Sequence, residues 1–298
     1  MGNARSLARE RRGNVVLVIV KNDPEACVTV RLAKLAGIAT IQLEASRMGI
    51  SLDDQPEAFD AILAARKREV WLFELPGPQM EAALRASYKV TVIDHHAYHN
   101  LGLDRTCDDE GNLRPSALEQ FLELAGIDDQ ELRMWDFNPR TIRGIGYFDA
   151  KLARGLREND YDKREIGDVM ALREEILRDT TPNFDEVNRK AALAWGRRER
   201  RNDRYWFVTA GGGVANAMLR YAIEDELDED VIVTAAHDGQ VFTVRHVSPE
   251  VIAHLTANID GHTFVFGSNN CFGIDNRHGD ARQVKLKHVL AALETAPW

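Results

Sequence analysis

VTVIDHHAYH, residues 90–99, joins a run of mostly β-branched residues to an acid and two histidines. The apolar run Val90–Ile93 predicts a buried β-strand that ends at Asp94, His95 and His96. Open α/β sheets bind their ligands outside the carboxyl ends of the strands. We therefore expect this carboxylate and these imidazoles at a functional edge of the sheet, although an isolated histidine more often caps, packs or faces solvent than binds metal.

Acidic residues follow further strand-like segments. VVLVIV (15–20), VWLF (70–73) and IGYF (145–148) each run into acids. Because strand ends of one sheet converge, we expect these side chains to line a single crevice. They are Asp23, Glu25, Glu74, Asp94, His95 and Asp149. Mixed carboxylate and imidazole ligands suit manganese or magnesium better than calcium or structural zinc. The alternative is that each acid caps or begins a helix.

Strand-like and helical segments alternate through the first half of the chain. ATIQLE (39–44) follows a helix expected near 26–36, and another helix is expected near 56–67. This alternation predicts an α/β fold with a doubly wound, mostly parallel sheet. Helical spacing returns at 117–125 and 152–177.

The length of 298 residues predicts more than one domain. We expect a flexible N-terminal arm at 1–14 and the sheet domain with a helical linker at 15–182. A second, smaller α/β domain is expected at 203–298, after a polar stretch that precedes the strand-like YWFVTA (205–210).

An acid pair, a lone acid, Asp-His-His and a later lone Asp occur in the order that is found in the DHH phosphoesterase superfamily. The chain resembles this family over residues 15 to about 155, including RPSALEQFLELAG at 114–126. Its members include single-strand exonucleases, oligoribonucleases, cyclic-dinucleotide phosphodiesterases and pyrophosphatases. The resemblance implies metal ligands at Asp23, Glu25, Glu74, His95 and Asp149. It also implies that Asp94 orients an imidazole or bridges ions and that His96 contacts the phosphoryl oxygens or the leaving group.

The motif departs from the family at the first two acid sites. Lys21 stands where the family has a histidine, and Glu25 and Glu74 stand where it has aspartates. Glutamate preserves the charge, but a lysine ammonium cannot bind metal and repels a nearby cation. The expected cofactor is therefore Mn²⁺ or Mg²⁺ as one or two ions, and Lys21 is a candidate contact to a phosphate oxygen.

Two glycine-containing segments near the C-terminus are candidate substrate contacts. GHTFVFGSNNCFGI (261–274) resembles the family's glycine-rich segment, with Ser268 in place of its histidine and Asn269 and Asn270 beside it. The glycines 211–213 precede a predicted helix, whose first N–H groups are suited to a phosphate. A simple tight turn at Gly211, Gly212 and Gly213 explains this triplet equally well.

Composition limits the partners and the compartment. The net charge of −9 argues against a general nucleic-acid coat, but not against a short oligonucleotide or a small phosphorylated substrate. The basic stretch RKAALAWGRRERRNDR (189–204) suits phosphate and base contacts or the solvated end of a linker helix. Three scattered cysteines support neither a disulfide framework nor a zinc site, and no long apolar run predicts a membrane span. We expect a cytoplasmic protein, with a homodimer as the candidate assembly.

These observations favour a divalent-metal-dependent phosphoesterase that hydrolyses phosphodiester or phosphoanhydride bonds. The alternative is a catalytically weakened relative that binds a nucleotide or a partner protein in the same crevice. A dinucleotide-dependent oxidoreductase is disfavoured because KNDPEACV, not a glycine-rich loop, follows the first strand.

Overall fold

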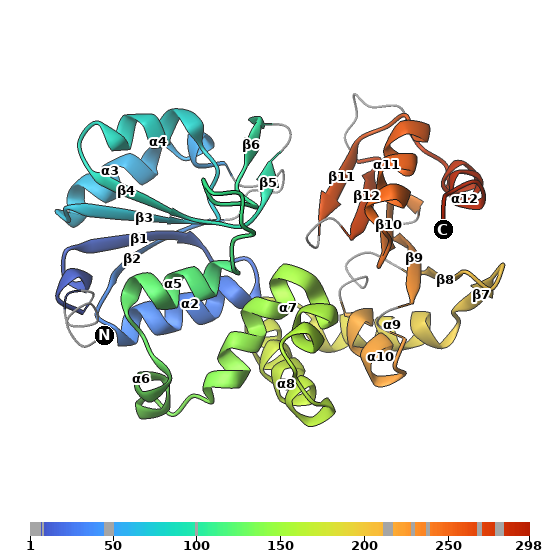
Figure 1. Ribbon diagram of the computed structural model, residues 1–298, viewed down its shortest axis with the longest axis horizontal. Coiled ribbons are helices and arrows are strands. Elements are labelled where there is room, and N and C mark those ends of the chain that lie inside the picture. Colours follow the sequence, from blue (N-terminus) through green and yellow to red (C-terminus); the bar gives the residue numbers. More distant parts are fainter. Residues whose placement is uncertain are drawn as a thin grey trace. The chain divides into compact units, whose positions relative to one another are not determined.

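Residues 7, 9–44, 51–98, 101–210, 217–227, 230–236, 239–266, 270–277 and 283–298 are described by the computed structural model. The chain divides into two compact units. The first comprises Met1–Ala150 with Tyr161–Thr180, and the second comprises Lys151–Asp160 with Thr181–Trp298. Each unit contains its own sheet with helices, so the predicted α/β class is confirmed (Figure 1).

The first unit is built on four parallel strands in the order β2-β1-β3-β4. They are β1 (Val15–Val20), β2 (Ala39–Leu43), β3 (Glu69–Phe73) and β4 (Lys89–Ile93). All residues of the inner strands β1 and β3 are buried. A strand that is covered on both faces needs apolar side chains at every position, which explains why VVLVIV shows no polar alternation.

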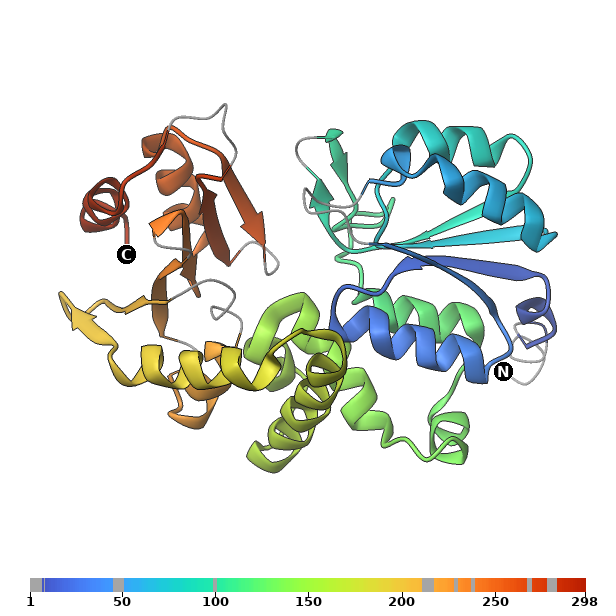
Figure 2. The ribbon, with the colours of Figure 1, turned by 180° about the vertical axis from the view of Figure 1, so that it is seen from behind.

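Helices cover both faces of this sheet (Figures 1 and 2). α3 (Pro56–Ala65) and α4 (Pro78–Arg85) lie on one face, and α2 (Pro24–Leu35) and α5 (Ala117–Ala125) lie on the other. The short helix η1 (Leu52–Asp54) precedes α3, and the hairpin β5 (Ala97–Tyr98) and β6 (Leu103–Asp104) follows β4. On the α5 side, Trp71 packs edge-on against Phe121 with ring centroids 6.1 Å apart.

Part of the segment that we expected to form a flexible arm is anchored. Residues 9–12 are helical, and Arg12 is only 7% exposed. Its guanidinium donates to both carboxylate oxygens of Glu131, at 2.7 and 3.0 Å, and to the carbonyl of Ala125 at 2.7 Å. The sequence contained no apolar signal for this contact because it depends on an ion pair.

After α5 come α6 (Asp129–Met134), α7 (Pro139–Glu158) and α8 (Lys163–Thr180). The prediction of a strand at IGYF was wrong, because residues 145–148 lie inside α7. The buried side chains Ile142, Ile145 and Phe148 are spaced by three residues, as one face of a helix requires. The helical path of α7 is broken at Lys151 and Leu152, immediately after Asp149 and Ala150.

The second unit contains a six-stranded sheet in the order β11-β12-β10-β9-β8-β7. Its strands are β7 (Glu199–Arg201), β8 (Tyr205–Thr209), β9 (Val231–Ala236), β10 (Val241–Arg245), β11 (Thr263–Phe266) and β12 (Cys271–Asp275). Only β8 and β9 are parallel among these pairs. Two separate apolar clusters form its core. Residues of α9 (Phe184–Gly196) and α10 (Met218–Glu224) belong to one, and residues of α11 (Pro249–Asn258) and α12 (Leu286–Glu294) belong to the other.

Arginines of the basic stretch after α9 form ion pairs with aspartates. Arg198 pairs with Asp225 and Arg200 pairs with Asp230, at 2.9 and 2.8 Å.

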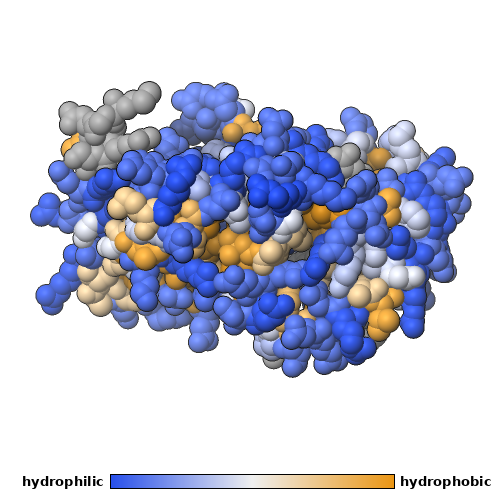
Figure 3. Space-filling view, turned by 90° about the horizontal axis from the view of Figure 1, so that it is seen from below, coloured by the Kyte–Doolittle hydropathy of each residue, from blue (hydrophilic) through white to orange (hydrophobic). Residues whose placement is uncertain are grey.

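Hydrophilic side chains cover most of the face that is shown in Figure 3. No helix within the described residues has the length and apolar character that crossing a membrane requires.

Candidate metal centre

The first two acids lie where β1 runs into α2. Asp23 is the N-cap of α2, and its Oδ1 accepts the N–H of Ala26 at 2.8 Å. Glu25 lies in the first turn of α2 and is fully buried. Its Oε1 accepts the N–H of Leu118, at the start of α5, at 2.8 Å. This contact fixes the carboxylate, whereas Oε2 is buried and has no hydrogen-bond partner among the residues that the structure describes.

Glu74 follows β3 in an unusual backbone conformation. Its φ of 50° lies in the left-handed region, which residues other than glycine seldom adopt. The N–H of Glu74 donates to the carbonyl of Ile93 at 2.9 Å, so the turn is tied to the end of β4. Strained backbone of this kind is frequent at functional sites. Here it places Oε1 of Glu74 3.1 Å from Nε2 of His95.

His95 is the point on which the acids converge. Its Nε2 lies 3.1 Å from Glu74, 3.5 Å from Asp149 and 3.8 Å from Glu25. The side chain of His95 is only 7% exposed. Burial disfavours the imidazolium, but the carboxylates of Asp149, Glu25 and Glu74 outweigh it and raise the pKa of His95 well above its usual value.

Asp149 reaches this cluster from α7, whereas the sequence had predicted that it follows a strand. Close packing of α7 brings it there. A Cβ at Gly146, three residues earlier, would overlap Oγ of Ser116 and lie 3.1 Å from Oε1 of Glu25. Only glycine at this position lets α7 approach α2 and the start of α5 so closely.

The acids repel one another strongly in this buried position. Burial and then the neighbouring Glu25 raise the pKa of Glu74 well above its usual value. Burial, followed by Asp149 and Glu25, raises the pKa of Asp23 to about 7. Burial and Asp149 raise the pKa of Glu25 in the same way. Asp149 is the exception, because the contact with His95 outweighs burial and lowers its pKa.

A divalent cation fits this set of residues. Ligand atoms of Glu74, His95, His96 and Asp149 all lie within 4.8 Å of one another. Oε1 of Glu74 and Nε2 of His95 lie 3.1 Å apart, yet within the described residues neither atom, nor Oε2 of Glu25, has a partner with hydrogen-bond geometry. Buried polar atoms without such partners are costly, so a site where three of them face one another fits a cation.

Asp94 lies beside the cluster and contacts one of its members, His96. Asp94 is fully buried, and its Oδ1 accepts from Nδ1 of His96 at 3.1 Å. Burial opposes its ionisation, but the hydrogen bond from His96 and the charge of Arg105 hold the pKa of Asp94 below its usual value. The amide of Gln120 donates to the backbone carbonyl of Asp94 at 2.9 Å. Gln120 and Arg105 were not predicted as partners of Asp94, because no motif marks a partner that is distant in sequence.

The remaining sequence-predicted residues are Lys21 in the first unit and the polar and glycine residues of the second unit. Lys21 is exposed. Gly211, Gly212, Gly213, Ser268 and Asn269 lie outside the described residues. Asn270 is 9% exposed, and its Oδ1 accepts from Sγ of Cys271 at 3.0 Å.

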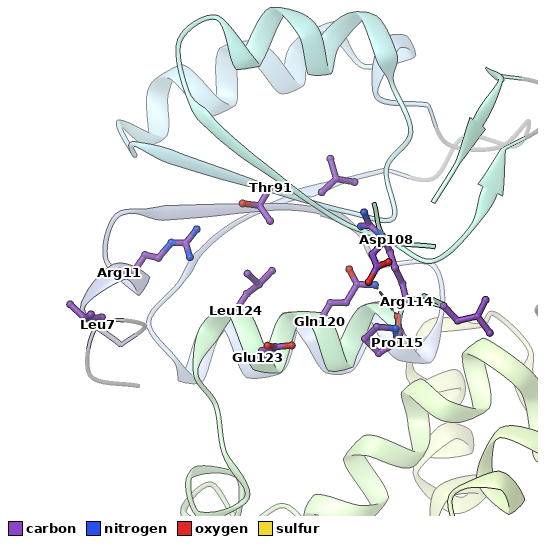
Figure 4. Close-up of a pocket in the computed structure, with 11 residues that line it drawn as sticks. Leu7, Arg11, Thr91, Asp108, Arg114, Pro115, Gln120, Glu123 and Leu124 are labelled. Atoms are coloured by element: carbon purple, nitrogen blue, oxygen red, sulfur yellow. Dashed lines mark hydrogen bonds between the residues drawn. The ribbon is translucent and has the colours of Figure 1, made fainter. Parts of the chain in front are cut away.

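A cavity of about 680 Å³ lies between the edge strand β4 and α5 (Figure 4). Thr91, Arg114, Gln120 and Leu124 line it. None of the clustered acids or histidines is among its lining residues, so the cavity is separate from the candidate metal centre.

Comparisons with known proteins give likenesses to solved structures alone. No family model and no curated protein matches the chain. RecJ from Thermus thermophilus in complex with Mg²⁺ aligns at 11% identity and a TM-score of 0.42 over 92% of this chain and 49% of RecJ. The chain thus spans about half the length of that protein. An uncharacterised protein from Helicobacter pylori aligns at 12% identity and a TM-score of 0.27, over 94% of this chain and 98% of its own. A candidate family II inorganic pyrophosphatase from Methanococcus jannaschii aligns at 12% identity and a TM-score of 0.28, over 94% and 99%.

Proposed function

We propose that the chain is a divalent-metal-dependent phosphoesterase whose ion is held by Glu25, Glu74, His95 and Asp149. The observation that carries this proposal is the group of buried atoms without hydrogen-bond partners on Glu25, Glu74 and His95. A cation shared by these atoms would satisfy all of them and offset the repulsion among the carboxylates. Carboxylate oxygens with one imidazole nitrogen favour Mn²⁺ or Mg²⁺.

The centre holds one ion in this proposal. Lys21 stands at the position of a family histidine and is exposed, so it adds no ligand for a second ion. Burial, and then the charges of Asp149 and Glu25, raise the pKa of Asp23 to about 7, so Asp23 lies close to the cluster. One of its carboxylate oxygens already caps α2, so Asp23 is a peripheral ligand or a hydrogen-bond acceptor for bound water.

The substrate would be a phosphodiester or phosphoanhydride in a short oligonucleotide or a small phosphorylated molecule. A divalent ion supplies charge neutralisation for the phosphoryl oxygens and activates water at neutral pH. His96, whose side chain is 41% exposed, contacts the phosphoryl oxygens or the leaving group. Asp94 fixes the imidazole of His96 through Nδ1, and Glu25 is itself fixed by the N–H of Leu118. Gly211–Gly213 and Ser268–Asn270 are proposed to grip the substrate.

Thermal unfolding with and without Mn²⁺ tests the metal centre. Binding to the folded state adds about 2.7 kcal/mol at a hundredfold excess over Kd. We expect Mn²⁺ to raise the Tm of the wild type and to have no effect on His95→Ala. His254→Ala is the control, because His254 is bonded within the second unit, to the carbonyl of Ala292. If calorimetry detects no Mn²⁺ binding to the wild type, the metal centre is refuted.

A binding protein without turnover is the second candidate, and Lys21 is the observation that favours it. An ammonium about 4 Å from a cation costs several kcal/mol at an effective dielectric near 20. A lysine at the position of the family histidine therefore suits a bound anion better than a pair of metal ions. The panel to be assayed with Mn²⁺ contains di- to pentanucleotides, cyclic dinucleotides and pyrophosphate. Turnover by the wild type, increased in Lys21→His, supports the enzyme. Tight binding without turnover by either protein supports the binding module.

A further inference from the structure

Asp94 lies at the centre of a buried polar network. Its Oδ1 accepts from the backbone N–H of His96 at 3.0 Å, from Nδ1 of the same residue at 3.1 Å and from the hydroxyl of Tyr98 at 3.3 Å. Its Oδ2 accepts from Nη1 of Arg105 at 3.0 Å. A carboxylate that is fully buried stays ionised only where such donors replace water. The two oxygens of Asp94 therefore have different partners.

Arg105 holds the carboxylate oxygen of Asp94 that does not contact His96. Its guanidinium bridges Asp94 and Glu81, and the whole residue is only 9% exposed. Its backbone N–H donates to the carbonyl of His96 at 2.9 Å. Its Cζ lies 5.9 Å from the ring centroid of Tyr98. Arg105 thus joins the end of β4, the hairpin β5–β6 and α4 at one point.

Asp94 is the acceptor that contacts Nδ1 of His96, at 3.1 Å. Oε1 of Glu74 is 3.6 Å from the same nitrogen, beyond hydrogen-bond distance, so the tautomer of His96 depends on the position of Asp94. The planar fork of Arg105 holds Oδ2 of Asp94 and thereby directs Oδ1 at the imidazole. When an acid holds the proton on Nδ1, the neutral ring keeps its lone pair on Nε2.

We propose that Arg105 is a positioning residue that keeps Asp94 on Nδ1 of His96, so that His96 is presented with a free lone pair on Nε2. The role of this lone pair in catalysis rests on the proposed function, in which His96 contacts the substrate. The arrangement itself involves only residues of the chain, so it forms without metal or substrate.

The tautomer of His96 can be measured in the metal-free protein. Long-range ¹H–¹⁵N correlation spectra at pH 8, with the His96 signals assigned by comparison with His96→Gln, show which ring nitrogen carries the proton. We expect the Nδ1–H tautomer in the wild type. Arg105→Gln should convert it into a mixture of tautomers. Arg105→Lys, which keeps the charge and loses the fork, should shift the signals less and in the same direction.

A matched control separates positioning from loss of an ion pair. Arg143→Gln removes another partly buried guanidinium of the first unit, which pairs with Glu119 and Asp129. It should lower the Tm and leave the His96 signals unchanged. If turnover is found, Arg105→Gln should lower kcat about tenfold or more, with a smaller change in KM.

Two results would overturn the proposal. One is an Nε2–H tautomer in the wild type. The other is a His96 spectrum that is unaltered in Arg105→Gln or, if that variant does not fold, in Arg105→Lys. Such a result would mean that Arg105 stabilises the fold and does not position Asp94. A failure to bind Mn²⁺ or to turn over substrate contradicts the proposed function and leaves the tautomer result standing.

Discussion

At the scale of single residues, the candidate metal centre is a costly arrangement that the rest of the site maintains. Glu25, Glu74 and Asp149 surround one imidazole in a buried position, and burial with mutual repulsion raises the pKa of the first two. Such groups are seldom retained in an interior without a function. The N–H of Leu118 and the left-handed turn at Glu74 hold the carboxylates in place, so the repulsion is not relieved by a change of rotamer.

The sequence was informative about the members of this cluster and uninformative about their supports. His95 and the acids were predicted because each stands beside an apolar run, and such a run is visible in a short window. Arg105 and Gln120 contact Asp94 from 11 and 26 residues away. A single sequence carries no signal for such long-range hydrogen bonds, because arginine and glutamine are ordinary surface residues.

The buried ion pair of Arg12 and Glu131 gives the chain a defined dependence on pH. Burial opposes the ionisation of Glu131, but the hydrogen bonds and charge of Arg12 outweigh it and lower the pKa of Glu131. A depressed pKa stabilises the fold above the unfolded value of about 4.3, and this contribution is lost as the pH falls through the folded value. Removing one partner of a buried ion pair leaves the other charge uncompensated, so Glu131→Gln should cost about 3 kcal/mol near pH 7.

The difference in Tm between the wild type and Glu131→Gln should narrow below about pH 4.3, which melting curves between pH 3 and 8 would show. Glu175→Gln is the control, because its pair with Arg31 is exposed on both sides and should contribute little. A difference that widens toward acid pH would contradict the assignment.

At the scale of elements, α7 shows where local sequence patterns mislead. IGYF resembles a short strand because it is apolar and aromatic, and it precedes an acid as the true strands do. The longer spacing of Ile142, Ile145 and Phe148 indicates a helix, and the structure follows that spacing. Asp149 was nevertheless predicted as a member of the site. An acid belongs to the cluster if its side chain reaches His95. A residue at a strand end can do so, and so can a residue on a helix that packs beside the strand ends.

The close approach of α7 depends on Gly146. Gly146→Ala places a methyl group against Ser116 and Glu25, and overpacking of this kind costs about 1–3 kcal/mol. Because α7 also carries Asp149, its displacement should weaken Mn²⁺ binding as well, which calorimetry would measure. Gly167→Ala is the matched control. A Cβ there meets no atom within 4 Å, so this variant should be neutral or stabilise α8 by up to about 1 kcal/mol. Unchanged metal affinity in Gly146→Ala would show that α7 does not position the ligand.

At the scale of the whole molecule, the alternation of strands and helices predicted the first unit well because each parallel strand needs a crossover helix. The second unit was predicted as α/β without its topology. Its sheet pairs strands that lie far apart in the sequence, such as β8 with β9 and β10 with β12, and antiparallel and parallel pairs are mixed. Local patterns specify a strand but not its neighbour, so pairing depended on tertiary packing.

The proposed ligands all belong to the first unit, and this gives a prediction for the molecule as a whole. Glu25, Glu74, His95 and Asp149 lie within Met1–Ala150, whereas the second unit has its own apolar clusters. Mn²⁺ should therefore slow amide hydrogen exchange in β1, β3, β4 and α5, and leave the exchange of β9, β10 and β12 unchanged. A hundredfold excess over Kd adds about 2.7 kcal/mol to the unit that binds the ion, which corresponds to roughly 5–10 °C in its melting temperature. His95→Ala should abolish the protection. Equal protection of both units by Mn²⁺ would mean that the ion acts somewhere other than the cluster around His95, and the ligand set proposed for it would be wrong.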